Sequence, residues 1–503
     1  MERQGKAGLG LRWMVGLVVV VAMLTTVDAL ALEGTFGEHG AISVDTQLSY
    51  TSSWRVEGKD DDFLAPGFGH SQGDDNFENG GQVESFFKAL IDADVNWKGD
   101  HGVFLRAVGF YDTVYSDRKS KFSSTLNPAA GDYYTNDYDD FEDVHGNNVD
   151  LLDAYAYTNF RLAGMPVDLR AGQQTIFWGE SLLIFGSVAS SMNPLDTTLS
   201  NTPGYETKEV LMPTGRLYGA ISTPDDKLTL AVSYKYEWDK SKVSEAGHYW
   251  ATSDALDGSV SNLLGIPRAA DVGEKDGDEY ALALRYLFDN GDEVGLYYVN
   301  YRDHLPQLKL GAAGYYLEYE DDIDLYAASY STVIPATNTN VAAEIGYRPS
   351  VMVGGVGTGQ YIDAEVLQIQ ANAIQLFGDV PGADAATGYF AAAYNTVLDR
   401  ERSELGKDKD AFGVRAKVIF DYFNVMDGLD MKVPVSVSWN PYNKTSFGIS
   451  GLSEGSHSYA VGLEGIYLGN YRASLTYTGY LGNTDDNSKT DRDFVTFQVK
   501  YTF

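Results

Sequence analysis

The chain ends in Asp493-Phe-Val-Thr-Phe-Gln-Val-Lys-Tyr-Thr-Phe503, where apolar and polar residues alternate from Val495 onward. A period of two predicts a β-strand with one apolar and one polar face. A soluble β-sandwich would bury the apolar face in its core, whereas a membrane barrel would turn that face toward lipid and the polar face toward the lumen. The stretch predicts an all-β protein and leaves these two architectures open.

The first residues of the chain have the pattern of an export signal. Basic residues precede an apolar run at residues 13–24, which is too short to span a bilayer as a helix. Ala29-Leu-Ala31 has the small-residue pattern of a cleavage site. We therefore predict a cleaved signal peptide at residues 1–31 and a single barrel domain at residues 32–503.

The composition narrows the class of protein. The 503 residues include no cysteine, which excludes disulfides and thiol chemistry. Tyrosine and glycine are abundant, with 35 and 53 residues. The formal net charge of -34 argues against nucleic acid as a partner, because phosphates would be repelled. The mildly polar average hydropathy fits a barrel, in which lipid-facing and water-facing residues alternate.

Strands with alternating faces recur along the chain, for example at residues 228–237, 280–288 and 471–478. Short connections alternate with long polar ones, as in bacterial barrels with short periplasmic turns and long extracellular loops. Eight short turns and nine longer loops predict a transmembrane antiparallel β-barrel of about 18 strands in the outer membrane of a Gram-negative bacterium. If the two weakest predicted strands, at residues 361–377 and 387–398, do not form, the predicted number of strands is 16.

Charges of both signs fall on the predicted inward face of the strands. Such a wall either forms hydrated ion pairs that hold the barrel in shape, or creates a transverse field that selects solutes in a lumen wide enough for water. Both interpretations stay open. The charges that we expect in the lumen are Arg106, Arg161, Arg170, Arg285, Arg348, Arg415, Glu344 and Glu464.

The connection at residues 180–214 is long and unusually apolar for an external loop. Because an exposed apolar loop is unfavourable, we expect it to fold into the lumen or to pack against the mouth. There it would either narrow a substrate path or simply brace the barrel. The residues that we expect to line such a constriction are Trp178, Glu180, Asn193, Lys208 and Glu209.

Several short motifs occur in this order along the chain: Gly73-Asp-Asp-Asn-Phe77, Leu151-Leu-Asp-Ala-Tyr155, Trp178-Gly-Glu-Ser181 and Asp491-Arg-Asp-Phe-Val495. Together they resemble the outer-membrane family catalogued as domain of unknown function 1302. The resemblance implies a barrel in outer-membrane lipid and lipopolysaccharide that takes part in uptake or export of hydrophobic compounds. It also implies an inner-membrane transporter of the RND (resistance-nodulation-division) type and a periplasmic companion.

The end of the chain also resembles the signal that the barrel-assembly machinery reads. That signal is a terminal aromatic residue with apolar residues at every second position behind it. Here those residues are Phe497, Val499, Tyr501 and Phe503.

The sequence gives little support for catalysis. The seven histidines form no H-E-x-x-H motif or other recognisable metal pair. His145 near Asp143 and His304 after Asp303 are no more than fragments of a catalytic site. We therefore expect no catalytic residue, no metal and no cofactor.

Three functions remain open. The leading one is a channel or transporter for hydrophobic or amphipathic small molecules that resemble lipids, sterols or hydrocarbons, acting passively or with an inner-membrane transporter. A general diffusion porin is the second, and it would conduct ions steadily. The third is a structural component of a trans-envelope lipid or efflux system.

Overall fold

The computed structural model describes residues 32–63, 72–116, 142–181, 183–199, 207–252, 262–263, 266–448 and 451–503. The signal peptide predicted at residues 1–31 lies outside this part of the chain. No helix among the described residues is long and apolar enough to cross a membrane.

The main sheet closes on itself as an antiparallel barrel. Each strand pairs with the next, and the first barrel strand pairs with the last from Gln47↔Thr502 to Arg55↔Phe494. Of the 19 strands in this sheet, all but β1 form the closed wall, which confirms the prediction of 18 barrel strands. The barrel strands are β2 (Gly40–Arg55), β3 (Gln82–Trp97), β4 (His101–Asp112), β5 (Asn147–Leu162), β6 (Met165–Gln174), β7 (Thr214–Ser222), β8 (Leu228–Lys235), β11 (Glu279–Leu287), β12 (Glu293–Tyr301), β15 (Ile323–Ile334), β16 (Thr339–Gly354), β17 (Tyr361–Val380), β18 (Ala383–Val397), β19 (Asp410–Met426), β20 (Leu429–Tyr442), β21 (His457–Tyr467), β22 (Tyr471–Leu481) and β23 (Phe494–Thr502).

Smaller elements, none of them predicted, supplement the barrel. Strand β1 (Leu32–Phe36) pairs with β2 at positions 40–44, beyond the part of β2 that β23 covers. The connections contain two short hairpins, β9 (Asn262–Leu263) with β10 (Ile266–Pro267) and β13 (Gln307–Gly311) with β14 (Gly314–Glu318). The short helices are η1 (Asp61–Phe63), α2 (Gln72–Asp75), η2 (Glu142–Gly146), α4 (Val188–Met192), α5 (Thr207–Val210) and η4 (Arg402–Glu404).

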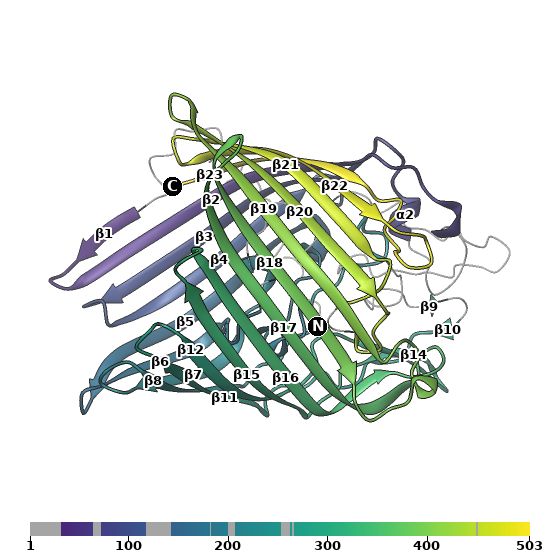
Figure 1. Cartoon of the computed structure of the whole chain (residues 1–503), viewed down its shortest axis with the longest axis horizontal. Helices are drawn as coiled ribbons and strands as arrows, with labels where there is room; N and C mark the ends of the chain where they lie inside the picture. The colour runs from purple at the N-terminus through teal and green to yellow at the C-terminus, as the bar shows by residue number, and fades with distance from the viewer. Residues whose placement is uncertain are drawn as a thin grey trace, which may run out of the picture.

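The two ends of the barrel differ in the length of their connections. Short turns gather at one end and long connections at the other (Figure 1). The turn between β3 and β4 is made by Lys98 and Gly99, both with positive φ (59° and 75°), a conformation that suits a tight hairpin. By the rule for bacterial barrels, the end with short turns is periplasmic and the end with long loops is extracellular.

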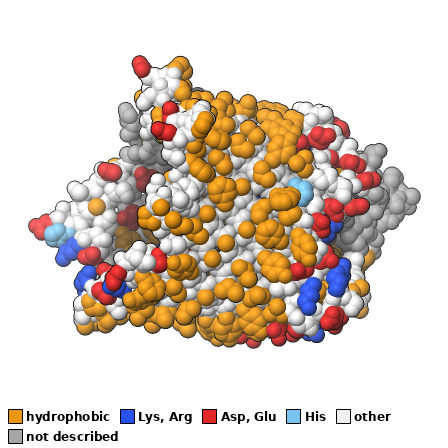
Figure 2. Space-filling model, in the orientation of Figure 1, with side chains coloured by type: hydrophobic (Ala, Val, Ile, Leu, Met, Phe, Trp, Pro, Cys, Tyr) orange, Lys and Arg blue, Asp and Glu red, His pale blue; other side chains and the backbone are white. Residues whose placement is uncertain are grey.

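The outer surface of the barrel carries a continuous apolar band. Figure 2 shows it across the strands that face the viewer, with charged side chains gathered at its two ends. Tyr280, Tyr298 and Tyr326 form a row of aromatic rings with centroids 5.8 and 5.2 Å apart, as expected for an aromatic girdle. In β23 the apolar Phe497 is exposed, whereas Thr496 on the opposite face is buried. The predicted alternation of faces is therefore confirmed.

Candidate functional site

The connection between β6 and β7 leaves the wall at Gln174 and enters the barrel. Ile176 and Trp178, immediately after β6, are buried in an apolar cluster with lumen-facing residues of several strands. The ring of Trp178 lies 6.4 Å from that of Tyr297 on β12. The helix α4 also packs against β12. Residues 175–213, without the undescribed positions, are called the lumen loop below.

Two charged residues of β16 hold the first half of the lumen loop. The carboxylate of Glu344 accepts hydrogen bonds from the backbone N–H groups of Glu180 (2.9 Å) and Val188 (3.0 Å). The guanidinium of Arg348 donates to the carbonyl of Gly186 (3.1 Å) and to the hydroxyl of Ser191 (2.8 Å). Both side chains are almost fully buried. Hydrogen bonds to charged groups are the stronger class, so β16 is a firm anchor for this segment.

The same segment reaches the strands beyond β16. Gln368 on β17 donates to the carbonyl of Phe185 (2.9 Å), and Asn372 donates to the carbonyl of Glu180. Ile184 packs in a buried cluster with Ala391 and Ala393 of β18. Since the loop starts at β6 and touches β16, β17 and β18, it crosses the lumen.

Two glycines permit this close approach. Gly179 and Gly186 both have positive φ, 83° and 94°. A Cβ atom on Gly179 would lie 2.1 Å from Oε2 of Glu344, and one on Gly186 would lie 2.3 Å from Oε1 of Gln368. Glycine is therefore required at both positions for backbone conformation and for space.

The returning half of the lumen loop is attached to β3. Lys88 forms a buried ion pair with Glu209, and Lys208 lies 3.4 Å from Asp92. The loop is thus held on two sides of the barrel by charged groups. Leu183 and Phe185 keep 38% of their surface exposed, and they present an apolar surface inside the barrel.

The predicted constriction residues take different places in this loop. Glu180 contacts β16 and β17 through its backbone, and Lys208 and Glu209 contact β3. Trp178 is buried against the wall, beside Tyr297 of β12. Asn193 is buried within the loop itself, where its amide donates to the carbonyls of Ile176 and Ala189 (both 2.8 Å). The structure therefore brings Glu180 together with Glu344, and it separates this pair from Lys208 and Glu209.

The predicted lumen charges occupy several environments. Arg106 bridges Asp92 and Asp153, with both contacts at 2.8 Å. Arg348 and Glu344 hold the lumen loop, as described above. The others contact neighbours on the wall or at its edge: Arg161 with the Gly164 carbonyl, Arg170 with Asp168, Arg285 near Glu180, Arg415 with Asn440, and Glu464 with Arg472.

A cavity of about 230 Å³ lies between the lumen loop and the wall formed by β3, β4 and β5. Phe86, Val108 and Phe110 make its apolar wall, and Met212 of the lumen loop also lines it. Two ion pairs lie in its lining, Lys88 with Glu209 and Lys242 with Asp150. The charged lining residues are Lys88, Lys242, Glu84, Asp112, Asp150, Asp196, Glu209 and Asp239. The cavity therefore combines an apolar surface with more carboxylates than cations.

Two histidines close one side of this cavity. The rings of His145 and His248 stack with their centroids 3.9 Å apart, and Tyr115 lies against His248. Burial, with some contribution from Arg492, lowers the pKa of His248 to about 3. Burial, followed by His248 and Lys242, lowers the pKa of His145 well below its usual range. Both rings are therefore neutral at physiological pH and add aromatic surface to the cavity.

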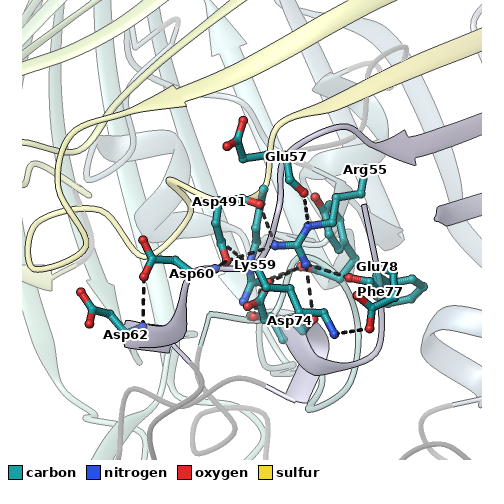
Figure 3. Close-up of polar contacts among 12 residues, drawn as sticks. Arg55, Glu57, Lys59, Asp60, Asp62, Asp74, Phe77, Glu78 and Asp491 are labelled. Atoms are coloured by element: carbon teal, nitrogen blue, oxygen red, sulfur yellow. Dashed lines mark hydrogen bonds and ion pairs between the residues drawn. The ribbon is translucent and has the colours of Figure 1, made fainter. Parts of the chain in front are cut away.

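A buried ionic network that sequence reasoning missed joins the first and last extracellular loops. Arg55, at the end of β2, forms ion pairs with Asp74 (2.8 Å) and Asp491 (3.0 Å), as Figure 3 shows. All three side chains are buried, as is Arg492, which donates to the carbonyls of Tyr249 and Ala251. The two motifs at residues 73–77 and 491–495 were visible in the sequence, but nothing there indicated that they meet.

These observations define the class of protein: a membrane-spanning β-barrel of the outer-membrane type, with a lumen crossed by one of its own loops. The chain belongs to the family described as "Protein of unknown function (DUF1302)", which it matches over residues 12–503. No curated protein matches it in sequence.

The solved structures to which this chain is similar include outer-membrane channels of low sequence identity. The Acinetobacter baumannii channel OccAB3 is 10% identical with a TM-score of 0.47, and the match covers 92% of this chain and 99% of that one. Pseudomonas aeruginosa OpdK, solved with vanillate, is 11% identical with a TM-score of 0.42 and coverages of 93% and 100%.

Proposed function

We propose that this protein is an outer-membrane channel for hydrophobic or amphipathic small molecules, and that the lumen loop restricts its path. The observation that carries the proposal is the apolar surface inside the barrel. It comprises Phe86, Val108 and Phe110 on the wall and the exposed Leu183 and Phe185 on the loop. Sites for small molecules combine apolar surface with polar groups that orient the ligand. In this cavity an apolar wall faces charged groups, most of them carboxylates, which suits an amphipathic ligand.

The attachment of the lumen loop to opposite sides of the wall favours a restricted path rather than an open pore. Apolar constrictions oppose the passage of ions because water leaves them readily. Within this proposal Glu180, Lys208 and Glu209 lie along the path, and the buried Trp178 and Asn193 shape the loop that forms it. We also propose that the barrel works beside an inner-membrane transporter of the RND type and a periplasmic companion.

Conductance in planar bilayers tests the proposal against a general diffusion porin. The purified barrel should insert and yet give small or infrequent openings, because the lumen loop crosses the lumen. Large, steady openings in the wild-type protein would overturn the proposal in favour of the porin.

Uptake of an apolar dye tests the substrate class and separates a channel from a purely structural component. Cells that carry the barrel should take up 1-N-phenylnaphthylamine, which fluoresces on reaching phospholipid, faster than cells without it. Phe110→Asn places a polar group in the apolar wall and should slow uptake severalfold. Phe104→Asn is the matched control, because Phe104 lies on the same strand and does not line the cavity. Equal uptake by Phe110→Asn and wild type, at equal surface levels, would contradict the proposal.

A further inference from the structure

The wall of the barrel is incomplete between the extracellular ends of β5 and β6. Pairing between these strands runs from Ala154↔Gln173 to Leu162↔Met165. Above Ala154, β5 continues to Asn147, and among the described strands its partner there is β4 alone. The chain that follows β6 turns into the lumen instead of continuing the wall, because Ile176 and Trp178 are buried inside the barrel.

A β-bulge lies at the lower edge of this gap. The register between β4 and β5 shifts between Leu105↔Ala154 and Ala107↔Leu151, so β5 has an extra residue there. Asp153 at the bulge points inward, because it binds Arg106 (2.8 Å) and accepts a hydrogen bond from the N–H of Thr175 (3.2 Å). Bulges bend a strand and end regular pairing. This one separates the end of β5 from β6.

The cavity lies beside the gap, because residues at the edge of the gap line it. Leu151 faces outward like its partner Ala107, and half of its surface is exposed. Gln173 faces outward beside Ala154, and its amide donates to the carbonyl of Leu151 (3.1 Å) where a strand-to-strand hydrogen bond would otherwise lie. Yet Leu151 and Gln173 both line the same cavity as the inward-facing Val108 and Phe110. The cavity therefore lies directly behind the gap.

We infer that this gap is a lateral exit, through which an apolar solute passes from the cavity into the hydrocarbon layer of the membrane. The inference rests on the proposed function and adds the route. Val149 and Leu151 at the edge of the gap are 43% and 50% exposed, so the passage has an apolar rim. An apolar solute that leaves sideways stays in contact with apolar surface, whereas a route through the periplasmic lumen would return it to water.

A single cysteine at Leu151 tests the exit, because the chain has no other cysteine. In Leu151→Cys, a small thiomethyl label should leave uptake of 1-N-phenylnaphthylamine by intact cells within twofold of wild type. A bulky trityl label at the same position should fill the gap and slow uptake at least fivefold. Leu217→Cys with the same labels is the control, because Leu217 is an equally exposed residue of β7 (51%) that does not line the cavity.

The possible results separate this inference from the proposed function. If cells with the wild-type barrel take up the dye no faster than cells without it, the proposed function fails and the exit fails with it. If the wild-type barrel speeds uptake and the bulky label at position 151 has no effect, the lateral exit is wrong and the channel stands. An equal block by the bulky label at position 217 would also overturn the exit.

Discussion

Glu344 offers the sharpest test of the idea that the lumen loop restricts the barrel. Its carboxylate accepts two hydrogen bonds from the backbone of the loop, at Glu180 and Val188, and it is 4% exposed. Glu344→Ala removes both bonds and leaves the β16 backbone unchanged. The two N–H groups can then find water only if the loop moves away from the wall, so the substitution favours a detached loop.

The expected size of the effect follows from these two bonds. Hydrogen bonds to charged groups contribute about 1.5–3 kcal/mol each. Loss of both, partly offset by water and by the bonds that Arg348 still makes, should destabilise the attached state by about 3 kcal/mol. Since about 1.4 kcal/mol corresponds to a factor of ten, the ratio of detached to attached loop should rise about 100-fold.

Single-channel recording measures this population. Glu344→Ala should open far more often than wild type, with openings of larger conductance. Gly179→Ala should act in the same direction, because its Cβ would lie 2.1 Å from the same carboxylate at a φ of 83°. Glu464→Ala is the control, since Glu464 makes a wall contact with Arg472 at 3.8 Å and should leave the recording unchanged. If Glu344→Ala inserts normally and conducts as wild type does, the reasoning about the loop is refuted.

Two further predictions concern the extracellular network. Arg55→Met removes the closer ion-pair partner of the buried carboxylates of Asp74 and Asp491 and leaves them only the longer contacts with Arg492 (3.8 and 3.9 Å), which should cost about 3–5 kcal/mol. Proteases should then cleave the extracellular loops of intact cells faster, and addition of Asp491→Asn should restore part of the protection; unchanged cleavage of Arg55→Met would contradict this. Burial and the nearby Asp74 raise the pKa of Asp491 to about 6, so the folded loop favours the protonated acid. The stability that protonation of Asp491 contributes is fully present below about pH 4, the pKa of an aspartate in the unfolded chain. It is lost as the pH rises through 6, the pKa of Asp491 in the folded loop. Hydrogen exchange at residues 481–493 should therefore be slower, relative to the intrinsic rate, at pH 5 than at pH 7, and Asp491→Asn should abolish the difference; equal protection at both pH values in the wild type would count against it.

The barrel was predictable because its physical cause is local. In a strand with lipid on one face and a lumen on the other, apolar and polar residues must alternate. Each strand can therefore be predicted from its own residues. Strands β17 and β18, the pair about which the strand count was undecided, both form and pair from Val366↔Val397 to Val380↔Ala383. The alternation of short turns with long connections was also readable, because tight hairpins need few residues and allow positive φ at Asn and Gly.

The contacts of the loops were not predictable, because they join residues far apart in the sequence. Arg55 meets Asp491 across 436 positions, and Glu344 meets the backbone of Glu180 across 164. Backbone N–H groups, which Glu344 binds, have no residue-specific signature at all. Gly179 and Gly186 were the indications in the sequence, since a glycine in an apolar loop suggests a close approach but does not name the partner.

The way in which the lumen loop is held bears on how it works. Its apolar side chains Ile176, Trp178 and Val188 are buried against the wall near β12. The stretch from 180 to 187 that crosses the lumen is held by polar bonds from Glu344 and Gln368 and by one buried apolar contact, that of Ile184 with β18. Exposure of packed apolar side chains costs free energy in proportion to their area, whereas water can replace part of each hydrogen bond once the segment moves into the lumen. The loop therefore has a fixed base and a crossing segment that can detach. An apolar solute bound against the exposed Leu183 and Phe185 would compete with water there and change the balance between the attached and detached states.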